Sequence, residues 1–95
     1  MDHTGVSEID KEEAKFKLYP NPNSGEMQLA YNLNDNETGY INIINLLGEK
    51  VNTYKLTREN NILHINEKQL KSGVYFYQLF INDNLVHSDK IILNK

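Results

Sequence analysis

The sequence predicts an all-β protein, a seven-stranded antiparallel β-sandwich of the immunoglobulin-like type. Short segments rich in β-branched and aromatic residues recur along the chain at intervals of roughly 8–12 residues. Clusters of Gly, Pro, Asn and Asp separate these segments, and no segment has the period of an amphipathic helix. The chain has no Cys and no Trp, so it lacks the disulfide and the buried Trp of antibody domains, and only their architecture is predicted.

The segment 70–81 is expected to contain the central strand, because it has the densest run of β-branched and aromatic residues and begins near a glycine. Side chains alternate along a strand, so every second residue from Tyr75 onward shares one face. We expect this face to be the inner one, since Gln78 makes the other face more polar. The inner face would then carry Tyr75, Tyr77, Leu79 and Ile81.

Six further strands are expected, at residues 16–19, 26–33, 40–46, 51–56, 62–65 and 85–93. Alternation of apolar and polar residues predicts that the inward side chains include Met27, Leu29, Tyr31, Leu33, Ile41 and Ile43. The strands are joined by a Pro- and Asn-rich turn at 20–25, loops at 34–39 and 57–61, and turns at 47–50 and 82–84. A longer connection at 66–72 is expected to place Leu70 against the core.

One domain is expected over residues 16–95, because a chain of 95 residues has room for a single modest core. The preceding segment 1–15 is polar and charged and is expected to be a flexible leader or linker. It lacks the apolar stretch of a signal peptide. Since the chain has no Cys, the sequence does not indicate a redox compartment.

Composition argues against several classes of function. The net charge of −3 provides no basic surface for nucleic acid, and no apolar run approaches the roughly 20 residues of a membrane-inserted helix. The three histidines, His3, His64 and His87, lie too far apart in sequence to form a metal-binding or nucleophile–base motif. We therefore expect no catalytic residue, no metal and no cofactor, and we expect these histidines to face solvent.

Two further features of the sequence bear on a binding site. The loop that begins at Asn34 partly follows the calcium-binding pattern of an EF-hand, but Asn45 stands where a bidentate Glu is required, so a plain polar loop is predicted. An immunoglobulin-like accessory, adhesion or carbohydrate-binding module would need a row of exposed aromatic residues on one sheet. Tyr40, Tyr54 and Tyr77 are the candidates for such a row.

Three motifs occur in order along the chain and are followed by a closing strand with two lysines. The motifs are Leu18-Tyr19-Pro20-Asn21-Pro22 followed by Gly25, then Leu47-Gly48-Glu49-Lys50-Val51, then Leu70-Lys71-Ser72-Gly73-Val74-Tyr75. With Lys90 in the closing strand and Lys95 at its end, the chain from residue 16 to 95 resembles the type A C-terminal sorting domain of the type IX (Por) secretion system of Bacteroidota. Many members of that family carry Asp where Asn45 stands here.

The resemblance implies a non-catalytic address on a larger secreted cargo protein. It implies Sec export to the periplasm, recognition by the type IX secretion translocon, and arrival of the cargo at the cell surface or outside the cell. A sortase-like peptidase would remove the domain by cleaving upstream of Phe16. The family's sorting-motif positions correspond here to Pro20, Asn21, Pro22, Gly48, Val51, Gly73, Val74, Tyr75, Lys90 and Lys95. The last strand is expected to lie near a sheet edge and to end free at Lys95.

Overall fold

The computed structural model describes residues 16–95, and the expected leader at 1–15 lies outside the described residues. The strands are β1 (Lys17–Tyr19), β2 (Glu26–Ala30), β3 (Gly39–Ile44), β4 (Lys50–Leu56), β5 (Ile62–Asn66), β6 (Gly73–Ile81) and β7 (Asn84–Leu93). Within this part of the chain, no helix has the length and apolar character needed to cross a membrane.

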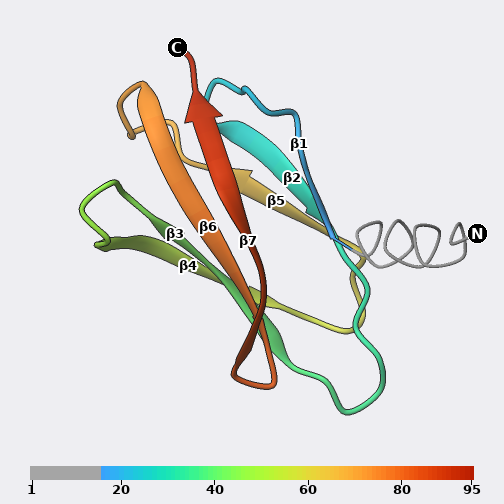
Figure 1. Cartoon of the computed structure of the whole chain (residues 1–95). Coiled ribbons are helices and arrows are strands. Elements are labelled where there is room, and N and C mark those ends of the chain that lie inside the picture. The colour runs from blue at the N-terminus through green and yellow to red at the C-terminus, as the bar shows by residue number, and fades with distance from the viewer. Residues whose placement is uncertain (1–15) are drawn as a thin grey trace, which may run out of the picture.

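The strands form two sheets, one with the order β1-β2-β5 and the other with the order β4-β3-β6-β7 (Figure 1). All neighbouring strands pair antiparallel. This arrangement confirms the predicted seven-stranded antiparallel sandwich. It also confirms the central place of β6, which pairs with β3 on one side and β7 on the other.

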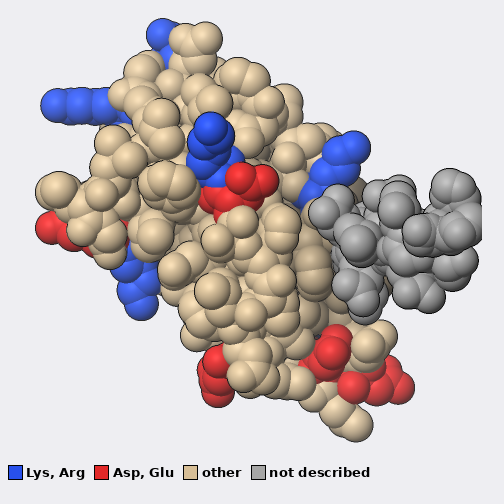
Figure 2. Space-filling model, viewed as in Figure 1, with Lys and Arg blue, Asp and Glu red and all other residues tan. Residues whose placement is uncertain are grey.

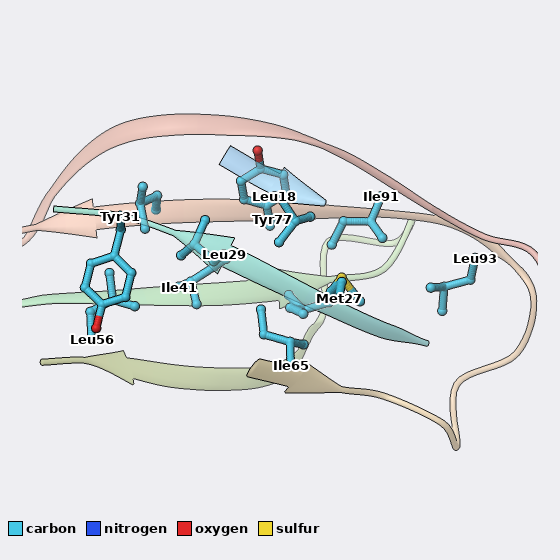
Figure 3. Packing of buried hydrophobic residues seen from close by; sticks show 12 residues of the cluster. Leu18, Met27, Leu29, Tyr31, Ile41, Leu56, Ile65, Tyr77, Ile91 and Leu93 are labelled. Carbon is cyan, nitrogen blue, oxygen red and sulfur yellow. The ribbon is translucent and has the colours of Figure 1, made fainter. Parts of the chain in front are cut away.

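The core lies between the two sheets, where apolar side chains from both inner faces meet (Figure 3). Leu79 of β6 is fully buried and Tyr77 is nearly so, which confirms the predicted inner face of the central strand. The predicted inward residues of β2 and β3 are confirmed as well, and Leu70 packs against the core as expected. The buried apolar residues are Leu18, Met27, Leu29, Tyr31, Ile41, Ile43, Leu56, Ile65, Tyr77, Leu79, Ile91 and Leu93.

Two predicted strands end earlier than expected. The strand predicted over 26–33 ends at Ala30, where its pairing with β5 stops. The strand predicted over 40–46 ends at Ile44, because the side chain of Asn45 accepts hydrogen bonds from the backbone N–H groups of Leu47 and Glu49 and closes a turn. Local side-chain bonds of this kind compete with strand pairing.

The histidines differ in their surroundings. His64 is exposed, as predicted, whereas His87 is half-buried, so the prediction that it faces solvent is wrong. Its ring stacks on Phe16 with the centroids 6.5 Å apart and lies 5.7 Å from the ring of Tyr77. Packing against aromatic rings explains the burial of His87. His3 lies outside the described residues.

Antiparallel order divides the connections between the two ends of the sandwich. The β1–β2, β3–β4 and β5–β6 connections lie at the end where β7 finishes (Figure 1). We call this the motif end, made of residues 20–25, 45–49, 67–72 and 94–95. The opposite end carries the β2–β3, β4–β5 and β6–β7 connections, residues 31–38, 57–61 and 82–83.

Candidate functional site

The predicted sorting residues come from four parts of the chain and gather at the motif end or in the strand residues beside it. They lie in the β1–β2 connection (Pro20, Asn21, Pro22), in the β3–β4 hairpin (Gly48, Val51), at the start of β6 (Gly73, Val74, Tyr75) and in or after the last part of β7 (Lys90, Lys95). Hydrogen bonds join the first, third and fourth of these parts. The hairpin residues stay apart, toward the far edge of the four-stranded sheet.

The Pro- and Asn-rich turn pairs with the outer edge of β7. The backbone N–H of Asn23 donates to the carbonyl of Ile92 at 3.0 Å, and the N–H of Asn94 donates to the carbonyl of Asn23 at 2.8 Å. These bonds make a parallel bridge between Asn23 and Leu93. The turn therefore covers the last part of β7, which is otherwise an edge strand with unpaired backbone groups.

The side chain of Asn21 adds two further hydrogen bonds between the turn and the backbone of β7. Its Nδ2 donates to the carbonyl of Lys90 at 2.9 Å, and its Oδ1 accepts from the N–H of Ile92 at 2.9 Å. A side-chain amide has both a donor and an acceptor, as a peptide group does, whereas a carboxylate has acceptors alone. This geometry explains Asn, and not Asp, at position 21.

The turn is also held internally by Asn23, which is nearly buried. Its Oδ1 accepts from the N–H of Gly25 at 2.8 Å, and its Nδ2 donates to the carbonyl of Pro20 at 3.0 Å. The peptide bonds before Pro20 and Pro22 are both cis. Side-chain bonds of Asn to nearby backbone groups are typical of tight turns.

Gly25 ends the turn at a point of close approach. Its φ is +109°, and a Cβ atom placed there would lie 3.0 Å from the carbonyl oxygen of Glu67 and 3.3 Å from Cε of Lys95. Its own carbonyl accepts from the N–H of Glu67 at 2.7 Å. Glycine is therefore required both by the backbone conformation and by the space.

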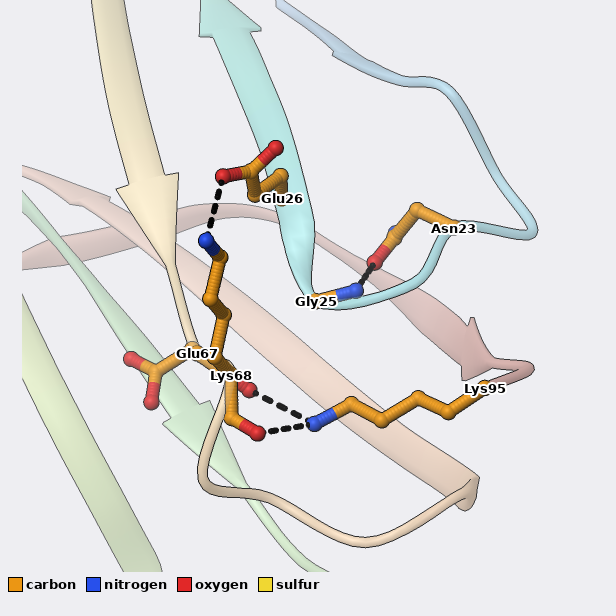
Figure 4. Close-up of polar contacts among 6 residues, drawn as sticks. All are labelled: Asn23, Gly25, Glu26, Glu67, Lys68 and Lys95. Carbon is orange, nitrogen blue, oxygen red and sulfur yellow. Dashed lines mark hydrogen bonds and ion pairs between the residues drawn. The ribbon is translucent and has the colours of Figure 1, made fainter.

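Lys95 is hydrogen-bonded to the β5–β6 connection, so the prediction that the chain ends free at this residue is wrong. Its backbone N–H donates to Oγ of Ser72 at 2.9 Å. Its ammonium group donates to three backbone carbonyls, those of Glu67, Lys68 and Leu70. Figure 4 shows the first two of these bonds. The connection turns at this point and directs these carbonyls to one place, where an ammonium group with three donors fits. The expected edge position of the last strand is confirmed.

Glu67 is fully buried and was missed by the sequence reasoning, which treated residues 66–72 as a plain connection. Its carboxylate accepts from the hydroxyl of Tyr54 at 2.5 Å, from Nδ2 of Asn52 at 2.8 Å and from Nε2 of Gln69 at 3.0 Å. Burial, together with the hydrogen bond and the negative charge of Glu67, raises the pKa of Tyr54 well above its usual value. Asn52 and Tyr54 belong to β4. Glu67 therefore joins the segment that follows β5 of the three-stranded sheet to β4, the edge strand of the four-stranded sheet.

The β3–β4 turn presents two exposed leucines that the sequence reasoning did not single out. Leu46 is 68% exposed and Leu47 is 83% exposed. The side chain of Asn45 fixes the turn by accepting from two backbone N–H groups, at 3.0 and 2.9 Å. The Nδ2 of Asn45 also donates to Oε1 of Glu49 at 2.9 Å, so the amide uses both its acceptor and its donor in this turn. Gly48 has a φ of +85° with no atom near its missing side chain, so its role is conformational.

The remaining hairpin and strand positions have definite structural surroundings. Val51 forms a bulge in β4. Ile43 pairs with Asn52 and Ile44 pairs with Lys50, so Val51 has no partner in β3. The hydroxyl of Tyr75 donates to the carbonyl of Lys71 at 2.9 Å. Tyr75 therefore connects β6 with the β5–β6 connection that precedes it.

The candidates for a carbohydrate-binding row do not share an exposed face. Tyr77 is buried, and burial together with the nearby charge of Asp89 raises its pKa to about 12. Tyr54 turns toward Glu67, and Tyr40 stacks on Phe80 with the centroids 5.0 Å apart. These residues are therefore wrong as candidates for a binding row. Among the described residues, no cluster of His, Cys, Asp or Glu is suited to a metal ion.

Comparison with protein families agrees with the resemblance noted from the motifs. The family model described as the secretion system C-terminal sorting domain matches residues 17–94. The chain belongs to this family, and it is a C-terminal sorting signal for type IX secretion. A search of the curated proteins finds no match. The domain thus directs a protein to the cell surface or to the outside of the cell.

Proposed function

We propose that the type IX translocon recognises this domain as a folded surface at its motif end, and not as a linear C-terminal sequence. The observation that carries this proposal is the hydrogen bonding of the Pro20–Gly25 turn to the last part of β7. Both backbone groups of Ile92 bond to this turn, so the conformation of the last strand depends on residues about 70 positions earlier.

The internal contacts of the motif residues support recognition of a pre-formed shape. Asn21, Tyr75 and Lys95 each bond to backbone groups of another segment of the domain or of a preceding turn. A surface that is ordered before binding loses less conformational entropy when it meets a receptor. The exposed Leu46 and Leu47 stand on a turn fixed in the same way and are candidates for direct contact.

The position of Phe16 is compatible with a fused cargo. Phe16 lies beside His87, in the first half of β7, while the motif end lies past the last residue of that strand. A cargo domain that precedes Phe16 would leave the motif end accessible. In this proposal the cargo is carried by Sec export into the periplasm, crosses the outer membrane through the translocon, and is released when a sortase-like peptidase cleaves upstream of Phe16. The domain itself carries out no chemistry.

A secretion assay tests the proposal. A fluorescent cargo with a Sec signal is fused ahead of the whole chain and expressed in a bacterium that has a type IX system. We expect the fusion to reach the cell surface or the medium, and we expect the variant Lys95→Met to accumulate in the periplasm. Lys71→Met is the matched control, since it removes an exposed lysine of the same end.

The outcomes separate two parts of the proposal. If the unmodified fusion stays in the periplasm, the proposed route is contradicted. If Lys95→Met is exported as fast as Lys71→Met while remaining folded, recognition of the assembled motif end is contradicted. Thermal unfolding of the purified variants shows whether the domain is still folded.

A further inference from the structure

The outer face of the four-stranded sheet has a regular arrangement that the sorting motifs do not explain. The strand register places outward residues in cross-strand rows that run from β4 to β7. Starting from the motif end, these rows are Val74–Ile92, then Lys50–Ile44–Phe76–Lys90, then Thr53–Asn42–Gln78–Ser88, then Lys55–Tyr40–Phe80–Leu85. One wholly polar row thus separates the two rows nearest the motif end from a last row that again has aromatic residues at its centre.

The two rows nearest the motif end form an apolar patch with a lysine at each side. Ile44 and Phe76 are direct cross-strand neighbours, Lys50 flanks them on β4, and Lys90 flanks them on β7. Phe76 and Val74 are each 37% exposed. We call the set Ile44, Lys50, Val74, Phe76, Lys90 and Ile92 the lysine-flanked patch.

The charges on this face have one sign. The outward positions of the four strands carry three lysines and no Asp or Glu. The nearest acidic residue on β7, Asp89, belongs to the other face by alternation and pairs with Tyr77. The side chain of Lys90 makes no hydrogen bond or ion pair with the part of the chain that the structure describes.

We propose that the lysine-flanked patch docks onto a protein surface of the type IX machinery that has an apolar ridge between two carboxylate groups. Lys50 and Lys90 stand on the outermost strands of a four-stranded sheet, three inter-strand steps apart. At about 4.8 Å per step, the matching carboxylates are expected about 14 Å from each other. The inference rests on the proposed function. It adds the chemistry of the partner surface, which is an apolar ridge between two carboxylate groups.

The geometry favours a protein over a lipid surface as the partner. The two lysines lie on opposite sides of the apolar patch, which fits a partner with paired charges at a fixed spacing. Binding to anionic lipid relies instead on clusters of basic residues. The polar row Thr53–Asn42–Gln78–Ser88 limits the patch on the side away from the motif end.

The proposal also gives a role to two motif positions. Val74 and Lys90 belong to the sorting motifs, and both lie on this outer face. Asn21 bonds to the backbone carbonyl of Lys90, so the turn at the motif end fixes the strand from which this lysine projects. The patch and the motif end are therefore parts of one continuous surface.

The test uses the fluorescent cargo fused to the whole chain. The double variant Lys50→Glu/Lys90→Glu reverses both charges of the patch. Lys17→Glu/Lys55→Glu is the matched control, since it changes the net charge equally at two exposed lysines outside the patch. We expect export of the patch variant to fall about tenfold or more, because like charges placed opposite each other at an interface are strongly unfavourable. We expect export of the control to stay near that of the unmodified fusion.

A photo-crosslinking amino acid gives a second readout. In place of Phe76, it is expected to form a crosslink to an outer-membrane translocon protein in living cells, and this crosslink is expected to disappear in the double variant. The same amino acid in place of Phe80, beyond the polar row, is expected to give little crosslink. Equal export of the two double variants, with equal crosslinking at both positions, would overturn the inference.

The remaining outcomes are also decisive. If Lys95→Met blocks export while the patch variant is exported normally, the proposed function stands and this inference fails. If the unmodified fusion is not exported, the proposed function itself fails. Co-sedimentation of the purified chain with vesicles of neutral and anionic phospholipid covers the membrane alternative. Vesicle binding that is lost on charge reversal of the patch would overturn the assignment of a protein partner.

Discussion

The two ends of the sandwich are stabilised in different ways. At the opposite end, Tyr31 bonds to Thr57, Thr38 bonds to Asn82, and an exposed pair joins Arg58 to Asp35. Figure 2 shows that acidic side chains gather at this end, near the β2–β3 and β6–β7 connections. At the motif end, hydrogen bonds join the β1–β2 turn to β7 and the chain end to the β5–β6 connection.

The bonds at the opposite end maintain the fold, whereas the bonds at the motif end also fix the shape of one surface. Both ends close the core, but within residues 16–95 it is the motif end that bonds the last part of β7 and Lys95 to earlier connections. A secretion system that accepts different cargo proteins needs a feature common to all of them. In the proposed function, the motif end is this common feature.

The largest effect is expected for Glu67→Ala. This change removes a buried carboxylate and leaves the hydroxyl of Tyr54 and the amide of Asn52 without their acceptor. We expect the free energy of unfolding to fall by about 2–4 kcal/mol. Urea unfolding of the purified domain measures it. At the opposite end, Glu37→Ala removes a half-buried carboxylate that accepts a single bond and is expected to cost about 1 kcal/mol or less. Equal losses for the two variants would contradict the difference between the ends.

Asn21→Asp tests the match between the turn and β7. The variant keeps the size of the side chain and the acceptor for the N–H of Ile92, but it places a carboxylate oxygen against the carbonyl of Lys90. We expect a loss of about 1–2 kcal/mol in stability. We also expect faster amide exchange at Ile92 and Asn94, with the amides of β2 unaffected. Unchanged exchange at Ile92 would show that the side-chain pairing contributes little.

Tyr77, which lies in the core between the two sheets, is expected to make the stability of the fold depend on pH. The pKa of Tyr77 is raised by burial, and then by Asp89, to about 12, so the folded state holds this proton more tightly than the unfolded state. The stability that Tyr77 contributes is complete below about pH 10, its unfolded value, and is lost as the pH rises toward 12. Thermal unfolding from pH 8 to 12 is expected to show a smaller decline for Tyr77→Phe than for the unmodified domain. Identical declines would contradict the assignment.

The smallest effect is expected for Asp35→Asn. This change breaks the pair with Arg58 at the opposite end, where both side chains are at least half exposed. Exposed ion pairs contribute about 0–1 kcal/mol, and salt screens them. Urea unfolding at low and high salt is expected to show almost no difference from the unmodified domain. A loss above about 2 kcal/mol would mean that the opposite end depends on its charged side chains as strongly as the motif end depends on Glu67.

Sequence reasoning succeeded where the structure depends on local pattern. Alternation along β2, β3 and β6 predicted the buried faces, and the clusters of Pro, Asn and Gly predicted the turns. Strand ends were harder to predict, since Asn45 closes its turn through side-chain bonds that compete with pairing. The motifs predict a set of sorting residues, but they do not predict the contacts that these residues make.

The contacts that were missed depend on topology. Glu67 looked like an ordinary polar residue of a connection, because its partners Asn52 and Tyr54 lie in a strand of the other sheet. The bonds from Asn21 to β7 join residues 69 and 71 positions apart. No periodicity in the sequence reports such a pairing, and it becomes visible only when the strand order is known.

One measurement tests the central claim most directly: the rate of export of a cargo fused to Asn23→Ala, compared with the same cargo fused to Tyr31→Phe. Each variant removes two hydrogen bonds of a side chain to the backbone, one at the motif end and the other at the opposite end. Each is expected to lose about 1–2 kcal/mol of stability. We expect the Asn23→Ala fusion to be retained in the periplasm and the Tyr31→Phe fusion to be exported normally. Equal export of the two variants would contradict recognition of the assembled motif end.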